Sequence, residues 1–283
     1  MIRKLWALVR RVVQPRGAAA FLLVAALVGV VVGLTAAALI GAIEGLSRVA
    51  EWTGEQLGST RVAALILVPL GLLIAWAISR RAPEVAGDGV PEAMAAVAIR
   101  SGYMPTRSAP LKILATSFTI GFGGSVGREG PIVQIGGAIG SAISRRTGMG
   151  EDRVRSMVAA GAGAAIGASF NAPIAGMLFA MEVIIGGFAV RHINSVVVAS
   201  VAAAVTTRSI VGQEQILRSF PHQLGDPREL ILYVGLGLLA VAVAFVFLTA
   251  LRRSEAARTW GPAWMRPVIL GLGVGGLAWL EPD

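Results

Sequence analysis

The stretch that decides the fold is GFGGSVGREGP, residues 121–131. It follows an apolar run at 111–122 and precedes a second one at 132–144, so it predicts that one helix ends and another starts within glycine-rich backbone. Further upstream, GDGVPE at 87–92 opens a short apolar helix, 93–99, that cannot cross a bilayer alone. Broken helices survive at membrane depth only against protein or a water-filled cavity, and in transporters they mark the binding site.

The composition indicates an all-α membrane protein. Of the 283 residues, 55% are hydrophobic and 14% are charged, and the mean hydropathy is +0.73. Soluble domains are roughly 45–50% apolar and about 25% charged. The 36 glycines also suit helices that pack closely inside a bilayer.

The N-terminal part predicts two spans with their outer ends in the cytoplasm. We expect a basic, interfacial cytoplasmic helix at 1–16, a first span at 18–43, a mixed-charge segment at 44–61 and a second span at 62–78. Basic residues precede the first span and follow the second, as the positive-inside rule requires of cytoplasmic ends. The remainder, 17–283, is expected to form one transmembrane domain of a multi-pass protein.

Several further apolar helices are expected downstream. Their ranges are 154–168, 173–185, 194–210, 230–251 and 267–280. Two small-xxx-small pairs, Gly136 with Gly140 and Gly163 with Gly167, predict ordinary close packing of these helices.

The same residues argue against several other functions. The net charge of +9 comes from basic residues that lie largely at the ends of apolar runs, which disfavours nucleic-acid binding. There is no cysteine, and His192 and His222 are too far apart to form a metal motif. The glycine-rich stretch lacks the ending of a phosphate-binding loop, and Ser125 has no histidine near it in sequence. We therefore expect no enzyme activity, no metal and no cofactor.

Both glycine-rich segments have the form of an anion site. A helix N-terminus offers unpaired N–H groups and the positive end of the helix dipole, and glycine lets a ligand approach that backbone. Proline near a helix start loses no needed hydrogen bond. Two such ends aimed at one point would hold an anion by partial charges alone. The candidate anion-binding residues are Gly87, Asp88, Gly89, Val90, Pro91, Gly127, Arg128, Gly130 and Pro131.

Glu129 is the candidate gate of this site. Its carboxylate would compete with a mobile anion for the same N–H groups, and protonation would remove that competition. The alternative is a static acid at a helix start, paired with Arg128. An ionisable residue at membrane depth favours the functional interpretation.

At these residues the sequence resembles the CLC family of chloride channels and proton/chloride antiporters. GREGP at 127–131 matches the family motif G-[KR]-E-G-P, and GDGVP at 87–91 lies 40 residues upstream, as the family's G-S-G-I-P does. FNAPIAG at 170–176 resembles a third family segment.

The resemblance implies both a fold and a function for this chain. It implies an inverted-repeat helix bundle with broken helices, of which this chain supplies the first repeat and the start of the second. It further implies a homodimer in the bilayer, which we place in the inner membrane of a bacterium. By the resemblance Glu129 is the gating glutamate, and the transported ligand is chloride or a similar small anion.

Three departures from the family pattern bear on function. Asp88 replaces a serine that donates a hydrogen bond to chloride, and an ionised aspartate would repel an anion unless it caps its helix or is neutral. Val183 stands where proton-coupled members carry an inner acid, directly after Glu182. The family's later G-x-F-x-P motif and its pore-closing tyrosine lie beyond Asp283, so we expect a domain that is incomplete at the C-terminus.

From Val183 we expect channel-like anion flow. The alternatives are a proton/anion antiporter of the same family and a non-conducting truncated membrane fragment. Glu182 itself is expected to be a buried acid bonded to a neighbouring helix. A cation-coupled solute carrier is weakened by the scarcity of carboxylates inside the spans.

Overall fold

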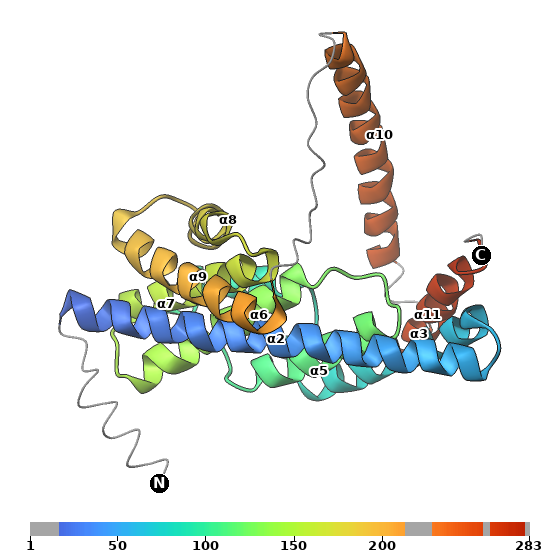
Figure 1. Ribbon diagram of the computed structural model, residues 1–283, viewed down its shortest axis with the longest axis horizontal. Coiled ribbons are helices and arrows are strands. Elements are labelled where there is room, and N and C mark those ends of the chain that lie inside the picture. Colours follow the sequence, from blue (N-terminus) through green and yellow to red (C-terminus); the bar gives the residue numbers. More distant parts are fainter. Residues whose placement is uncertain (1–16, 213–227, 257–260, 281–283) are drawn as a thin grey trace. The chain divides into compact units, whose positions relative to one another are not determined.

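The computed structural model describes residues 17–212, 228–256 and 261–280; the interfacial helix expected at 1–16, and His222, lie outside these ranges. The helices are α2 (Ala18–Gln56), α3 (Thr60–Arg81), α4 (Val90–Ile99), α5 (Ser108–Gly121), α6 (Glu129–Arg146), α7 (Glu151–Phe170), α8 (Pro173–Phe179), α9 (Val190–Val211), α10 (Glu229–Ala256) and α11 (Met265–Leu277), with a 3-10 turn η1 (Pro83–Val85) and a π-helical turn η2 (Ala180–Ile185) (Figure 1). In the described ranges, α2, α3, α9 and α10 each contain a stretch long and apolar enough to cross a bilayer. The prediction of an all-α membrane fold is confirmed.

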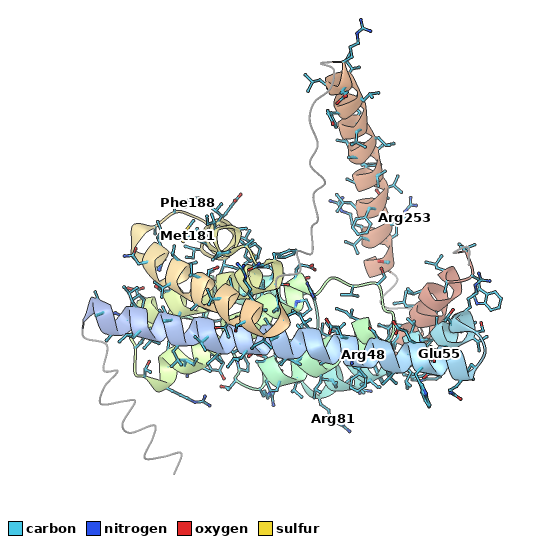
Figure 2. All side chains as sticks on the ribbon, viewed as in Figure 1. Arg48, Glu55, Arg81, Met181, Phe188 and Arg253 are labelled. Atoms are coloured by element: carbon cyan, nitrogen blue, oxygen red, sulfur yellow. The ribbon has the colours of Figure 1, made fainter. Side chains whose placement is uncertain are left out.

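The first helix is longer than the sequence suggested. Where a mixed-charge connection was expected from residue 44, α2 continues to Gln56. Arg48 and Glu55 both lie on this C-terminal half of α2 (Figure 2). Glu44 and Arg48 are one turn apart, and their side chains pair at 3.9 Å on the exposed surface. Charged residues with good helix propensity extend a helix in this way, because their side chains can face outward.

Helices α6 and α7 form the centre of the core and pack almost backbone to backbone. A Cβ atom on Gly136 would collide with the carbonyl oxygen of Gly161, and one on Gly140 would collide with that of Met157. Glycine is the only residue that permits so close an approach. The prediction that this pair serves helix packing is confirmed.

The second glycine pair joins α7 to α8 and α9. Gly163 lies against the carbonyl oxygen of Gly176, and Gly167 lies against the hydroxyl of Ser200. That hydroxyl donates to the carbonyl of Pro173 at 2.9 Å, so the start of α8 is fixed on α9. Helix α2 runs along α9 on the other side, where Thr207 donates to the carbonyl of Gly33 at 3.0 Å (Figure 1).

Contacts divide the chain into two compact units, Met1–Glu214 with Pro267–Asp283, and Gln215–Arg266. In the first unit α11 packs on α3, with Gly271 against Pro69 and Gly275 against Ala64. In the second unit the described helix is α10, whose 28 residues include a window of mean hydropathy 2.7. That composition is typical of a membrane span.

Candidate anion-binding site

The two glycine-rich segments meet, at the starts of α4 and α6. Gly89 precedes α4 with a φ of 114°, a left-handed conformation that favours glycine. A Cβ atom there would lie 2.6 Å from the carbonyl oxygen of Gly130, in the first turn of α6. Asp88 also lies against Gly130. The structure therefore brings together two of the segments in which the sequence predicted anion-binding residues.

Glu129 is the first residue of α6, three positions before the helix start that the sequence predicted. The half-buried side chain folds back so that Oε2 lies against Gly127. The carboxylate thus lies over the exposed backbone that precedes the helix. In this position it can compete with an anion for the unpaired N–H groups of the first turn.

Arg128 does not pair with Glu129 in the structure. Its guanidinium donates to the carbonyl of Ser169 at 3.4 Å, at the end of α7. A static Arg128–Glu129 ion pair was the alternative to a gate, and the orientation of Arg128 removes the basis for it. The guanidinium of Arg128 is therefore directed to the end of α7.

Asp88 lies one residue before Gly89, the N-cap of α4, and binds the first residue of that helix. The N–H of Val90 donates to Oδ2 of Asp88 at 3.3 Å. The side chain is exposed and its other oxygen, Oδ1, lies against Gly130. The sequence left a capping role open for Asp88, but the N-cap position belongs to Gly89, and the second oxygen of Asp88 faces the start of α6.

Lys112 is a site residue that the sequence analysis did not identify. Its side chain is 3% exposed, and its ammonium donates to the carbonyls of Val85 at 2.8 Å and Gly87 at 2.7 Å. These bonds hold the backbone just before Asp88. The signal was present in the sequence, because Lys112 is an ionisable residue inside an apolar helix and one of only two lysines.

Gln134 was also missed. It is buried one turn into α6, and its amide nitrogen donates to the carbonyl of Glu84. Its carbonyl oxygen lies against Gly89 and has no hydrogen-bond partner in the structure. A glutamine in an apolar helix carries no signal for such a contact, since Glu84 is 50 residues away in sequence.

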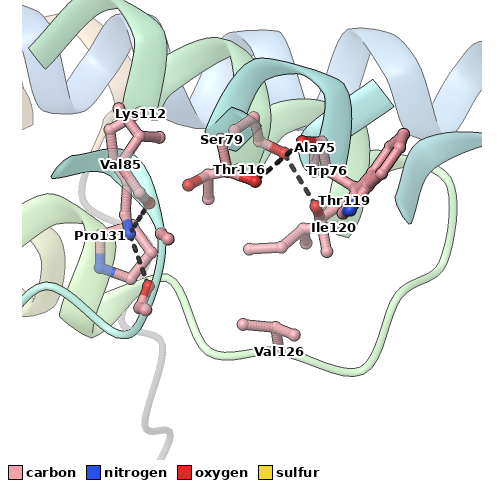
Figure 3. Close-up of a pocket in the computed structure, with 13 residues that line it drawn as sticks. Ala75, Trp76, Ser79, Val85, Lys112, Thr116, Thr119, Ile120, Val126 and Pro131 are labelled. Carbon is pink, nitrogen blue, oxygen red and sulfur yellow. Dashed lines mark hydrogen bonds between the residues drawn. The ribbon is translucent and has the colours of Figure 1, made fainter. Parts of the chain in front are cut away.

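A cavity of about 270 Å³ lies beside both segments. Figure 3 shows Lys112 and Pro131 on one side of it, Ser79, Thr116 and Trp76 on another, and Val126 on the loop below. The Ser79 hydroxyl donates to the carbonyl of Trp76 at 2.8 Å, which leaves its oxygen lone pairs as acceptors. The irregular backbone at this position therefore lines a partly polar cavity. Non-helical backbone inside a membrane is tolerated in such a place, because its polar groups can find partners there.

Glu84 anchors the entry to α4 from outside the spans. Its carboxylate accepts a hydrogen bond from Nε of Arg107, and that hydrogen bond, with the positive charge of Arg107, lowers the pKa of Glu84 against a smaller opposing effect of burial. Because the Glu84 carbonyl also accepts from Gln134, η1 is tied to both α5 and α6.

The segment after α8 differs from the expected single helix at 173–185. The chain changes to a π-helical turn at Ala180, and Glu182 is exposed while Val183 is half-buried against the main core. The prediction of a buried Glu182 is wrong, because the wider π turn directs Glu182 outward and Met181 and Ile184 inward.

Comparison with known proteins identifies relatives along most of the chain. Residues 70–283 match the family described as "Voltage gated chloride channel". The chain is 30% identical over 276 residues to the H(+)/Cl(−) exchange transporter ClcA of Yersinia pseudotuberculosis, covering 92% of this chain and 56% of that protein. It is 31% identical over 234 residues to ClcA of Vibrio campbellii, covering 80% of this chain and 50% of that protein. The chain thus spans about half the length of these curated relatives.

Solved structures share the fold. A slow cyanobacterial Cl−/H+ antiporter superposes with a TM-score of 0.80 at 23% identity, over 93% of this chain and 64% of that one. A CLC-type fluoride/proton antiporter superposes with a TM-score of 0.75 at 22% identity, over 93% of this chain and 65% of that one.

Proposed function

This chain belongs to the voltage-gated chloride channel (CLC) family, and we propose that in its complete protein it forms part of a pathway that exchanges a small anion, chloride first, for protons. The named relatives are exchange transporters, which supports exchange over the channel-like flow that Val183 suggested. The chain spans about half the length of these exchange transporters.

The observation that carries this proposal is the contact of Gly89 with Gly130. It places the start of α4 against the start of α6, with the Glu129 carboxylate folded over Gly127. Two helix starts and glycine backbone attract an anion through partial charges, which binds it weakly enough to let it leave. The nearby ammonium of Lys112 is engaged by two backbone carbonyls.

A second candidate function is passive anion flow through the same site. Val183 favours it, because valine cannot carry a proton and its side chain is half-buried in the main core. Protonation of Glu129 would then gate the pathway without coupling it to proton transport.

We further propose that the complete protein is a homodimer in a bacterial inner membrane, with its N-terminus in the cytoplasm. Apolar side chains of α8 and α9 support the dimer, since Ile174, Leu178, Val201 and Val205 are all exposed. The last turn of α3 ends in Arg80 and Arg81, which supports a cytoplasmic location for that end.

The test is an exchange assay on the complete protein in phosphatidylethanolamine–phosphatidylglycerol liposomes. A chloride gradient is imposed without a proton gradient, and chloride and protons are followed together. We expect chloride movement to drive protons uphill in the opposite direction. Chloride flux without proton movement would select the passive function, and the absence of any anion flux would contradict both.

A further inference from the structure

Two carboxylates from different elements contact the start of α6. Oε2 of Glu129 lies against Gly127, and Oδ1 of Asp88 lies against Gly130. The two contacted backbone positions are three residues apart in the chain. Both acids therefore border the region where the helix N–H groups would receive an anion.

The charges around Asp88 do not cancel. Glu92, in the first turn of α4, lies with Oε1 against Gly87, and its Oε2 is buried without a hydrogen-bond partner. Lys112 is the cation that faces this group from α5. Two carboxylates and one ammonium leave one negative charge in excess. The start of α4 therefore carries an excess of negative charge beside the region where an anion would bind.

The remaining charged groups near Asp88 do not alter this balance. On α6, Arg128 is directed to the carbonyl of Ser169, and Glu129 adds a further negative charge. On η1, Glu84 is held by Arg107. The net charge at the start of α4 therefore stays negative when the charged residues of α6 and η1 are included.

A buried acceptor marks the same place. The carbonyl oxygen of Gln134 lies against Gly89, is part of a side chain only 1% exposed, and has no donor in the structure. An ionised carboxylate offers acceptors only, whereas a protonated one adds an O–H donor. The carbonyl oxygen of Gln134 therefore lacks a hydrogen-bond donor, which a protonated carboxyl group could supply.

We propose that Asp88 is a second proton-carrying residue of the anion pathway and exchanges its proton with Glu129. The proton leaves the carboxyl group of one residue and binds the carboxylate of the other, directly or through water, and no other bond changes. Asp88 would thereby supply the acid that Val183 cannot. The inference rests on the proposed exchange function and names the group that carries its protons.

The test compares wild-type complete protein with Asp88→Asn and Asp88→Ser in the same liposomes. Both replacements keep a side-chain acceptor for the N–H of Val90, and neither can carry a proton at this position. We expect both variants to retain chloride flux while the number of protons moved per chloride falls by about tenfold or more. Asp88→Glu should restore much of the coupling. Glu55→Gln, an acid-to-amide change at an exposed residue of α2, is the control and should retain the wild-type ratio.

The outcomes separate this inference from the function on which it rests. Wild-type proton-to-chloride ratios in both Asp88 variants would overturn the role of Asp88 and leave exchange standing. Equal losses of chloride and proton movement would also overturn it, because that pattern assigns Asp88 to structure. Chloride flux without protons in the wild type would contradict the exchange function itself.

Discussion

Glu129 is a half-buried carboxylate at a helix start, and its ionisation determines what the start of α6 attracts. Ionised, it competes for the N–H groups beside Gly127; protonated, it loses that attraction. We expect Glu129→Gln to conduct anions with a flattened pH profile, because the amide mimics the protonated gate at every pH. The measurement is chloride efflux from liposomes between about pH 7.5 and about pH 4.5. An unchanged profile would contradict the gating role.

Gly89 fixes the distance between the two broken helices. Its φ of 114° and its contact with the carbonyl of Gly130 both exclude a side chain. We expect Gly89→Ala to lower the free energy of unfolding by about 1–3 kcal/mol and to impair anion flux. Gly148→Ala is the control, because Gly148 also has a positive φ, of 74°, but no neighbour within 4 Å. It should lose stability through backbone strain and keep its flux. Similar flux losses in both variants would contradict a site-specific role for Gly89.

The packing of α6 on α7 leads to a prediction about stability. The carbonyl of Met157 occupies the space that a Cβ atom on Gly140 would need. Gly140→Ala should therefore destabilise the folded state by about 1–3 kcal/mol through overpacking. In Gly41→Ala the new methyl group meets nothing within 4 Å, and alanine should be neutral or stabilising by about 0.5–1 kcal/mol in α2. Thermal unfolding in detergent measures both, and equal midpoints would refute the close-packing argument.

The tie between η1 and α5 gives a pH-dependent prediction. Because Arg107 lowers the pKa of Glu84 from its ordinary value of 4.5, the ionised form stabilises the folded state. This contribution is fully present above pH 4.5 and is lost as the pH falls through the lowered pKa. Arg107→Gln should remove that acid-side loss and leave the remaining pH dependence unchanged. Unfolding midpoints of both proteins across the acid range provide the test, and parallel curves would argue against the pairing.

The positions of most helices along the chain follow from the lengths of the apolar runs and from the positions of glycine and proline. The break before Glu129 and the short α4 were predicted because proline and glycine interrupt apolar runs there. The continuation of α2 to Gln56 was not predicted, because its charged residues were interpreted as the end of the span although their helix propensity is good. The π turn at Ala180 was not predicted either, because no periodicity marks it. Lys112 and Gln134 escaped prediction for another reason. Their partners are backbone carbonyls 25 to 50 residues away, which only the folded chain brings near.

Proton coupling is the property on which the sequence and the matched relatives lead to different expectations. By the resemblance, Val183 stands where proton-coupled members carry an inner acid, whereas the relatives that this chain matches are named as exchange transporters. The adjacent Glu182 could substitute only if its side chain reached the position that Val183 holds. Glu182 and Val183 are consecutive residues of the π-helical turn η2, so their side chains point in different directions. In the structure Glu182 is exposed and Val183 faces the core.

We therefore expect Glu182→Gln to leave proton coupling intact. The complete protein, reconstituted in liposomes with a chloride gradient, should move the same number of protons per chloride before and after this change. The physical reason is that a proton route through the anion site must pass the starts of α4 and α6, which Asp88 and Glu129 line. Val183→Glu is the companion variant, and any gain of coupling in it would show that an inner acid at this position can still reach the site. If Glu182→Gln abolished proton movement while chloride flux continued, Glu182 would be the second proton carrier and the route through Asp88 would be wrong.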